Sequence, residues 1–157
     1  MFNLFKKKEE SFKIVACVDG ILQNIEDVND VVFSQKMMGD GFSIIPISNT
    51  VVAPISGNIE FAFPTGHAFG IKSNDGVEVL IHVGIDTVNL NGQGFKTLVK
   101  QGNKIKAGQP LVKMDLDLIK QNGYDPTIMV IFTSGYNKPI QLDYGKNVKA
   151  NQILIES

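Results

Sequence analysis

The two histidines of this 157-residue chain, His67 and His82, lie near each other in the sequence with a turn signal between them. A neutral imidazole carries a free lone pair near physiological pH and can act as a nucleophile. A second imidazole beside it can donate a hydrogen bond to a phosphoryl oxygen, and the hydroxyl of Thr65 can fix the tautomer of the His67 ring. These residue types and this spacing fit transfer of a phosphoryl group through a histidine nitrogen.

Other chemistries need side chains that the sequence does not supply. A catalytic zinc normally uses three protein ligands, whereas this chain has two histidines and a single cysteine, Cys17. The His-Glu-x-x-His, Gly-x-Ser-x-Gly and glycine-rich nucleotide-binding patterns are all missing. We therefore expect no metal and no cofactor.

The histidines fall on two expected strands. Apolar residues alternate over 77–83, which predicts a strand with one face in the core and with Leu80 and His82 on the other face. On the preceding strand, His67 and Phe69 share a face, because residues two apart point the same way. The pairing register then decides whether the two histidines meet.

A two-residue turn at 75–76 would pair Phe69 with His82, and a four-residue loop would pair His67 with His82 directly. Either register places both imidazoles on one outer face, together with Phe69 and Leu80. We interpret this apolar face as a docking surface. A three-residue loop would put the histidines on opposite faces, and the interpretation would fail.

Short apolar stretches separated by X-Gly turns continue along the whole chain. The turn signals are Asp40-Gly41, Ser56-Gly57, Asp75-Gly76, Asn91-Gly92, Gln101-Gly102, Ser134-Gly135 and Tyr144-Gly145. This pattern predicts an all-β protein, an antiparallel β-sandwich, with short helical turns only at 95–100 and 115–121.

The sequence also contains an internal repeat. Residues 102–112 and 145–155 both read Gly-x-x-[Ile/Val]-Lys-Ala-x-Gln-x-Leu-[Val/Ile]. We interpret the two segments as duplicated turn-and-strand units in related places of the sandwich.

Composition and charge narrow the class of protein. We expect one domain over 11–157 and a flexible tail over 1–10. A net charge of −1 argues against nucleic-acid binding, and a single cysteine fits the cytoplasm. No apolar run is long enough to span a bilayer. The tail, with three apolar residues before three lysines, would make at most weak contact with an anionic membrane.

Four segments, at 30–41, 51–57, 64–69 and 81–95, closely resemble the glucose-type enzyme IIA of the bacterial phosphoenolpyruvate-dependent sugar phosphotransferase system. The most specific of them contains His82-Val-Gly-Ile-Asp-Thr-Val88. The resemblance runs from about Ile14 to the C-terminus. It implies a sandwich built from duplicated hybrid motifs, in agreement with the internal repeat.

The resemblance also implies a role for each site residue. His82 would accept a phosphoryl group on Nε2 from the phosphohistidine of the histidine-containing phosphocarrier protein and pass it to a cysteine of a IIB domain of a sugar permease. His67 would stabilise the phosphoryl group, Thr65 would orient a ring, and Asp30 and Asp86 would border the site. The implied apolar docking patch comprises Val31, Val32, Phe33, Phe63, Phe69 and Val88.

Biotinyl and lipoyl carriers share the hybrid-sandwich architecture and form the alternative interpretation. Residues 53–57 and Val112-Lys113-Met114 are similar to their signatures, but the lysine falls in an expected strand rather than at a turn.

The chain also departs from the IIA pattern. Leu80 and Val83 replace flanking aromatic residues, Asn89 stands where some members have an acidic residue, and Gly66 stands where asparagine often precedes the first histidine.

Overall fold

Strands form most of the regular structure in the computed structural model, which describes residues 12–157. The strands are β1 (Lys13–Val15), β2 (Gly20–Asn24), β3 (Asp40–Pro46), β4 (Thr50–Val52), β5 (Gly57–Ala62), β6 (Ala68–Lys72), β7 (Glu78–Val83), β8 (Phe95–Thr97), β9 (Lys104–Ile105), β10 (Pro110–Met114), β11 (Ile128–Ser134), β12 (Asn147–Val148) and β13 (Ile153–Glu156). The helices are η2 (Ile25–Asp27), α1 (Val31–Ser34), η3 (Thr87–Leu90) and α2 (Leu116–Gln121). The expected tail at 1–10 lies outside the described residues.

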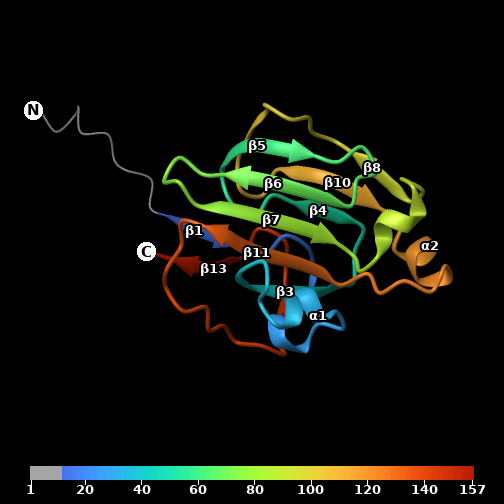
Figure 1. The fold of residues 1–157 in the computed structure, drawn as a ribbon, viewed down its shortest axis with the longest axis horizontal. Coiled ribbons are helices and arrows are strands. Elements are labelled where there is room, and N and C mark those ends of the chain that lie inside the picture. Colours follow the sequence, from blue (N-terminus) through green and yellow to red (C-terminus); the bar gives the residue numbers. More distant parts are fainter. Residues whose placement is uncertain (1–11) are drawn as a thin grey trace, which may run out of the picture.

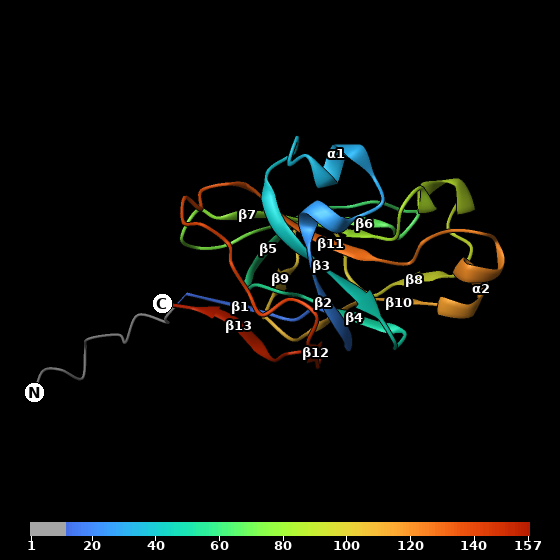
Figure 2. The ribbon, with the colours of Figure 1, turned by 90° about the horizontal axis from the view of Figure 1, so that it is seen from below.

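The strands pair into one large and two small antiparallel sheets (Figure 1). The large sheet has eight strands in the order β12-β2-β3-β11-β7-β6-β5-β9, and the small sheets are β4-β10-β8 and β1-β13. Seen from below, α1 lies on one side of the large sheet, and β4 and β10 lie on the other (Figure 2). The expected all-β antiparallel fold is confirmed.

Each face of the large sheet is packed against a different layer. The main core lies between the sheets and includes Ile14, Phe42, Val51, Phe69, Val79, Ile81, Leu111 and Val130. The opposite face of β6, β7 and β11 carries a smaller apolar cluster of Ile25, Val28, Phe33, Ala68, Leu80, Ile85, Met129 and Ile131. This outer cluster is covered by η2 and α1, so both faces of the central strands are buried.

Two of the sequence expectations about local structure are wrong. Residues 95–97 form β8 instead of a helical turn, because Phe95 to Thr97 pair with β10 along the edge of the small sheet. Asp40-Gly41 opens β3 instead of forming a turn. A β-carbon on Gly41 would lie 2.0 Å from the carbonyl oxygen of Val130, so glycine is needed there for close strand approach. The expected helical turn at 115–121 is confirmed by α2.

The helices that the sequence analysis missed are short, and two of them, η2 and α1, begin with polar side-chain caps. Asn24 caps η2, and the side chain of Asp30 accepts hydrogen bonds from the backbone nitrogens of Val32 and Phe33 at the start of α1. Such caps satisfy amide groups that have no partner inside the helix. Among residues 12–157, no helix is long and apolar enough to cross a membrane.

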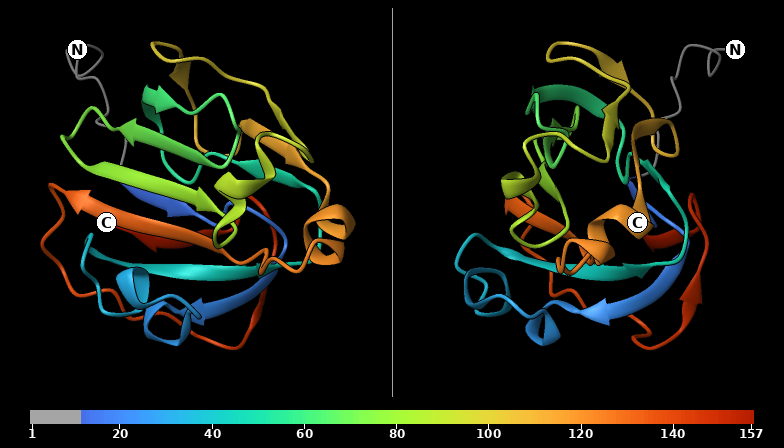
Figure 3. Two further views of the ribbon diagram at one scale, coloured as in Figure 1. Left: turned by 45° about the vertical axis from the view of Figure 1, so that its right-hand side comes forward. Right: turned by 90° about the vertical axis from the view of Figure 1, so that its right-hand side faces the viewer.

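The two copies of the internal repeat are coloured yellow to orange (102–112) and red (145–155) in Figure 3, and they share local backbone and hydrogen-bond geometry. Gly108 and Asn151, which align in the repeat, both have a left-handed backbone, with φ of 91° and 75°. The side-chain oxygens of Gln109 and Gln152 each accept a hydrogen bond at 3.0 Å from the backbone nitrogen three residues earlier. The duplication inferred from the sequence is confirmed at this level of detail.

The two units also contact each other at equivalent positions. The amide of Gly108 donates to the carbonyl of Ala53, and that of Asn151 donates to the carbonyl of Ala16. A β-carbon on Gly108 would lie only 2.4 Å from the side-chain oxygen of Asn151. The duplicated units therefore meet at Gly108 and Asn151.

Candidate functional site

The β6–β7 hairpin that positions the two histidines has a register that the sequence analysis did not favour. Ala68 pairs with His82 and Gly70 with Leu80. The backbone nitrogen of Ser73 donates to the carbonyl of Val77, which leaves a loop of three residues, 74–76. The expected two- or four-residue loop is therefore wrong, and regular alternation would place His67 on the opposite face from His82.

The two imidazoles nevertheless lie side by side, with ring centroids 5.3 Å apart and ring planes at 78°. His67 precedes β6 and does not follow its alternation. Gly66, with φ of 73°, closes a tight turn in which its amide donates to the carbonyl of Phe63. This left-handed residue turns His67 toward His82, so a bend in the chain achieves what the register alone would prevent.

Gly66 is also fixed by packing. A β-carbon at this position would lie 2.7 Å from Cβ of Phe95 and 3.2 Å from the hydroxyl of Thr97. The departure from the family pattern at Gly66 therefore has a structural reason in this chain, because β8 packs directly against the turn.

Hydrogen bonds orient both rings. Nδ1 of His82 lies 2.7 Å from the carbonyl oxygen of Gly84. A carbonyl can only accept, so Nδ1 carries the proton and the lone pair is on Nε2. Nδ1 of His67 is hydrogen-bonded to the hydroxyl of Thr65. This bond orients the His67 ring, and because a hydroxyl can both donate and accept, a tautomer fixed by Thr65 stays a prediction.

Burial lowers the pKa of both histidines below the ordinary value of 6.5. For His82 the main cause is loss of solvent, which the bond to Gly84 and the charges of Asp30 and Asp86 partly oppose. For His67, which is 5% exposed, loss of solvent is again first and the positive charge of His82 adds to it. Both rings are therefore neutral at physiological pH, as a nitrogen nucleophile requires.

Aromatic side chains and carboxylates surround the pair. The ring of Phe33 lies 5.1 Å from that of His82, and the ring of Phe63 lies 5.3 Å from that of His67. The side chain of Asp30 caps α1, so its carboxylate has a structural role. Asp86 is exposed, starts η3 and makes no side-chain capping bond. Of the two carboxylates, that of Asp86 is the one free of a capping role.

The structure divides the expected docking residues into an exposed and a buried group. The exposed group comprises Val31, Val32, Phe63 and Val88, which have relative exposures between 41% and 63%. Phe33 and Leu80 are almost buried in the outer cluster, so they can present only an edge. Phe69 is fully buried in the main core, because the three-residue loop turns it away from His82. Phe69 as a docking residue is therefore a wrong expectation.

Two methionines near the site were not anticipated. Met37 and Met38 follow α1 and are 68% and 44% exposed. Met38 lines a hollow of about 160 Å³ together with Gly70 and Leu80. Leu80 precedes His82 by two residues in β7. A signal was available in the sequence, since both methionines lie within the 30–41 segment, although Ser34, Gln35 and Lys36 separate them from Phe33.

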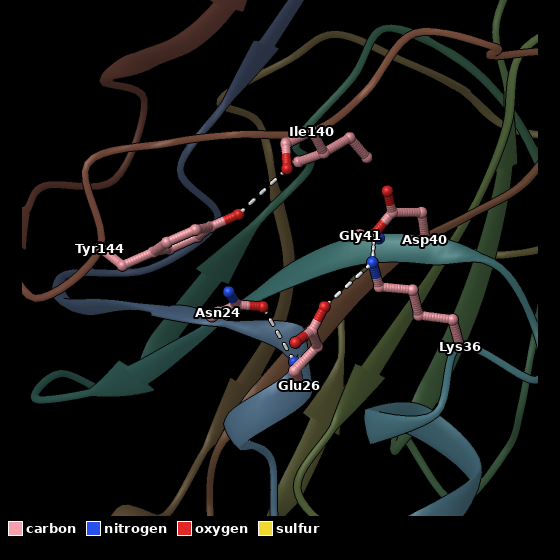
Figure 4. Close-up of polar contacts among 7 residues, drawn as sticks. All are labelled: Asn24, Glu26, Lys36, Asp40, Gly41, Ile140 and Tyr144. Carbon is pink, nitrogen blue, oxygen red and sulfur yellow. Dashed lines mark hydrogen bonds and ion pairs between the residues drawn. The ribbon is translucent and has the colours of Figure 1, made fainter.

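An ion-pair cluster fixes the segment that carries these exposed residues (Figure 4). The ammonium group of Lys36 lies 3.3 Å from Glu26 and 3.5 Å from Asp40. Lys36 has a left-handed backbone, with φ of 58°, at the end of α1. The cluster thus connects η2, the end of α1 and the start of β3, and these carboxylates raise the pKa of Lys36.

The remaining candidate chemistries find no site in the part of the chain that the structure describes. Within 12–157 no group of three or more histidine, cysteine, aspartate or glutamate side chains could hold a metal ion. Lys113, the lysine considered for a biotinyl or lipoyl carrier, lies inside β10 and pairs with Thr50 and Lys96. It is not at the tip of a turn.

Comparison with known proteins places this fold in a family of phosphotransferase components. The sequence model of the family described as phosphoenolpyruvate-dependent sugar phosphotransferase system, EIIA 1, matches residues 12–137. The chain belongs to this family. Its antiparallel fold and paired histidines therefore belong to a component of the bacterial sugar phosphotransferase system.

Similar proteins carry names of the same kind. The chain is 44% identical over 134 residues to "PTS system glucose-specific EIIA component" of Staphylococcus epidermidis, covering 85% of this chain and 81% of the relative. It is also 44% identical to part of "PTS system glucose-specific EIICBA component" of Streptococcus pneumoniae, covering 85% of this chain and 18% of that protein. Among solved structures, glucose permease IIA from Mycoplasma capricolum matches with a TM-score of 0.85 and 40% identity, covering 93% of this chain and 95% of the other.

Proposed function

We propose that this protein carries a phosphoryl group on Nε2 of His82, which it receives from the phosphohistidine of the histidine-containing phosphocarrier protein. It then passes the group to a cysteine of a IIB domain of a sugar permease. The observation that carries the proposal is the bond from Nδ1 of His82 to the carbonyl of Gly84. This bond leaves the lone pair of a neutral imidazole on Nε2, the nitrogen that is free to attack phosphorus.

Each transfer proceeds between side chains of two proteins, and this chain supplies His82. The lone pair of His82 Nε2 forms a bond to phosphorus while the phosphorus–nitrogen bond of the donor imidazole breaks, and the donor nitrogen recovers its lone pair. In the second transfer the cysteine sulfur of the IIB domain forms a bond to phosphorus while the phosphorus–nitrogen bond to His82 breaks. Nε2 of His82 then recovers its lone pair.

His67 is the second group that acts on the phosphoryl group. Its ring lies edge-on to that of His82, and Thr65 fixes its orientation. A ring nitrogen of His67 that carries a proton donates a hydrogen bond to a phosphoryl oxygen on His82. Because both rings are fixed before the donor arrives, this contact needs no reorganisation during transfer.

The surface around the pair serves to exclude water and to select partners. Phe63 lies against His67, and Phe33 of α1 lies against His82. Together with exposed Val31 and Val32 of α1 and Val88 of η3, they offer apolar contacts with which an incoming protein covers the reacting atoms. The charge of Asp86 attracts a basic group on the partner and raises the association rate. The name of the Streptococcus relative, EIICBA, is consistent with IIB and IIC partners.

The test is to incubate the protein with phosphoenolpyruvate, enzyme I and the phosphocarrier protein and to locate the label. We expect an acid-labile phosphate on His82 and none on the His82→Ala variant. The His67→Gln variant should accept phosphate from the carrier but donate it poorly to a IIB domain. Undiminished phosphate on a folded His82→Ala variant would remove His82 from the mechanism.

Three expectations from the sequence stay predictions. These are the single domain at 11–157, the cytoplasmic location, and the at most weak membrane contact of residues 1–10. Vesicle sedimentation with anionic lipid, with and without residues 1–10, tests the last of them.

A further inference from the structure

Asn91 and Gly92 form an exposed turn at the end of η3, close to the histidine site. Asn91 has φ of 52° and ψ of 38°, and Gly92 has φ of 89°, so both residues are left-handed. The backbone nitrogen of Asn91 donates to the carbonyl of Val88. The Asn91 side chain and the Gly92 amide, in contrast, have no hydrogen-bond partner among residues 12–157.

An asparagine followed by glycine can lose its side-chain amide by an intramolecular reaction. The backbone nitrogen of the glycine loses its proton and forms a bond to Cγ of the asparagine, while the bond from Cγ to Nδ2 breaks and ammonia leaves. Water then opens the resulting cyclic imide at one of its two carbonyls. The products are aspartate and isoaspartate, and the net reaction consumes one amide and one water.

The two reacting groups are the side-chain amide of Asn91 and the backbone nitrogen of Gly92. They can react without first breaking a hydrogen bond. Glycine favours ring closure because it has no side chain to hinder the approach of its nitrogen and because its backbone is mobile. We propose that Asn91 is a site of spontaneous deamidation, and that its isoaspartate product displaces Gly92 and changes the orientation of His67.

The chain offers a matched internal comparison, because it contains one other Asn-Gly pair, Asn122-Gly123. Asn122 is also exposed and follows a short helix, α2. There, however, the side-chain nitrogen of Asn122 donates to the carbonyl of Leu118 at 2.8 Å. The attacking nitrogen, that of Gly123, donates to the carbonyl of Lys120 at 2.9 Å. Both reacting groups of this pair are held in place.

The link from Asn91 to the histidines is the position of Gly92 beside Thr65. A β-carbon added to Gly92 would lie 3.8 Å from Cα of Thr65, so the two residues are neighbours. Thr65 in turn holds the ring of His67 through its hydroxyl. Isoaspartate adds a methylene to the main chain and a negative charge to the turn. Gly92 must then move relative to Thr65, and the Thr65 bond transmits the movement to His67.

The first test measures the modification itself and is independent of phosphoryl transfer. The purified protein is aged at mildly alkaline pH, digested, and analysed by mass spectrometry and by an isoaspartate-specific methyltransferase. We expect the amide-to-acid conversion at Asn91 to be several-fold faster than at Asn122, with isoaspartate as a product. The Asn91→Gln variant should stay unmodified at residue 91. Conversion at Asn91 that is no faster than at Asn122 would overturn the proposal.

The second test measures the effect on the ring. The aged fraction with one extra negative charge, which contains the aspartate and isoaspartate forms, is separated from the unmodified protein by ion exchange. Its imidazole resonances are recorded with nitrogen-15 labelling, and those that match the Asn91→Asp variant are assigned to the aspartate form. We expect the His67 resonances to shift in the isoaspartate form and to stay nearly unchanged in Asn91→Asp, which adds the charge without the methylene. Unchanged His67 resonances in the isoaspartate form would overturn the coupling to the histidine pair.

Discussion

Burial disfavours a charged imidazole at both His67 and His82 and lowers the pKa of each. At His82 this effect outweighs the bond to Gly84 and the charges of Asp30 and Asp86, whereas at His67 the positive charge of His82 adds to it. The consequence for stability can be stated with its sign. Each folded-state pKa lies below 6.5, so the unfolded chain binds more protons than the folded one as the pH falls past this value. Folding therefore loses stability on acidification through 6.5, and the loss levels off once the folded-state pKa values are passed.

This prediction is checked by urea unfolding at a series of pH values. The pH-dependent loss just below 6.5 should be smaller in the His67→Gln variant than in the unmodified protein, because one of the two groups no longer titrates. An identical pH dependence in both proteins would show that the His67 pKa is not lowered by folding.

Gly66 determines where His67 lies, and this too can be tested at a single residue. Gly66→Ala adds a β-carbon at a left-handed position, which costs roughly 1–2 kcal/mol. It also brings that carbon within 2.7 Å of Cβ of Phe95. Gly76→Ala is the matched control, since Gly76 has φ of 84° and nothing within 4 Å of its β-carbon position.

We expect Gly66→Ala to lose more unfolding free energy than Gly76→Ala in chemical denaturation. We also expect it to shift the ring resonances of His67, whereas Gly76→Ala should leave them in place. Equal effects of the two substitutions on stability and on His67 would contradict the role assigned to Gly66.

The chemistry of these residues could be predicted from the sequence, but their geometry could not. Two imidazoles and a nearby threonine were enough to suggest a nitrogen nucleophile. The hairpin loop proved to have three residues, which by alternation alone should have separated His67 from His82. The pair survives because Gly66 ends the alternation before β6. Alternation rules apply only inside a strand, and the sequence did not show that His67 lies outside it.

At the scale of elements, α1 is a single helical turn that separates two apolar residues facing solvent from one facing the protein. Val31 and Val32 are 63% and 41% exposed, whereas Phe33 is 7% exposed and packs in the outer cluster. A charge at position 32 and a charge at position 33 should therefore have different effects on the fold. A glutamate at position 33 would be buried without a partner and would destabilise the protein.

We predict that Val32→Lys leaves thermal unfolding nearly unchanged and lowers the rate of phosphoryl transfer from the carrier by about tenfold or more, because transfer needs close positioning. Phe33→Ala should instead lower the unfolding free energy by about 3 kcal/mol, as expected for a buried phenylalanine. Ile153→Lys is the control for Val32→Lys, since Ile153 is 46% exposed but belongs to β13 in a different sheet.

Thermal unfolding and transfer rate are measured on all three variants. If Ile153→Lys slows transfer as much as Val32→Lys does, the loss comes from added charge rather than from this surface.

Short elements such as α1 and η2 were missed from the sequence, because three or four residues contain too little periodicity. The caps at Asn24 and Asp30 were the only local signals.

At the scale of the whole molecule, the duplicated units meet where Gly108 and Asn151 touch. The aligned positions differ in residue type but share the left-handed backbone. Only one of the two can carry a side chain at this contact, since a β-carbon on Gly108 would collide with the amide of Asn151. Close packing of the two repeat units therefore requires glycine at position 108 when asparagine stands at position 151.

A double-mutant cycle tests this contact. Gly108→Ala should destabilise the protein by more than Gly102→Ala, whose added carbon meets nothing within 4 Å although its φ is also 91°. Asn151→Gly should restore part of the loss in the double variant, because it removes the colliding side chain. Additive effects in urea unfolding would show that the two positions are not coupled.

The overall class of fold was the most predictable feature. Turn signals, strand lengths and the internal repeat together indicated an antiparallel all-β protein, and the repeat reappears with matching backbone angles and hydrogen bonds. The docking surface was predicted less completely, because exposure depends on which layer covers a strand. Phe69 belongs to the main core, and Met37 and Met38, which we had not selected, are exposed beside α1.

The central claim is that the phosphoryl group is carried on Nε2 of His82. The most direct measurement is nitrogen-15 and phosphorus-31 NMR of the protein phosphorylated by phosphoenolpyruvate, enzyme I and the phosphocarrier protein. The account predicts phosphorus coupled to Nε2 of His82, with Nδ1 still protonated and bonded to the carbonyl of Gly84. Phosphorus bonded to Nδ1 of His82, or to either nitrogen of His67, would contradict it.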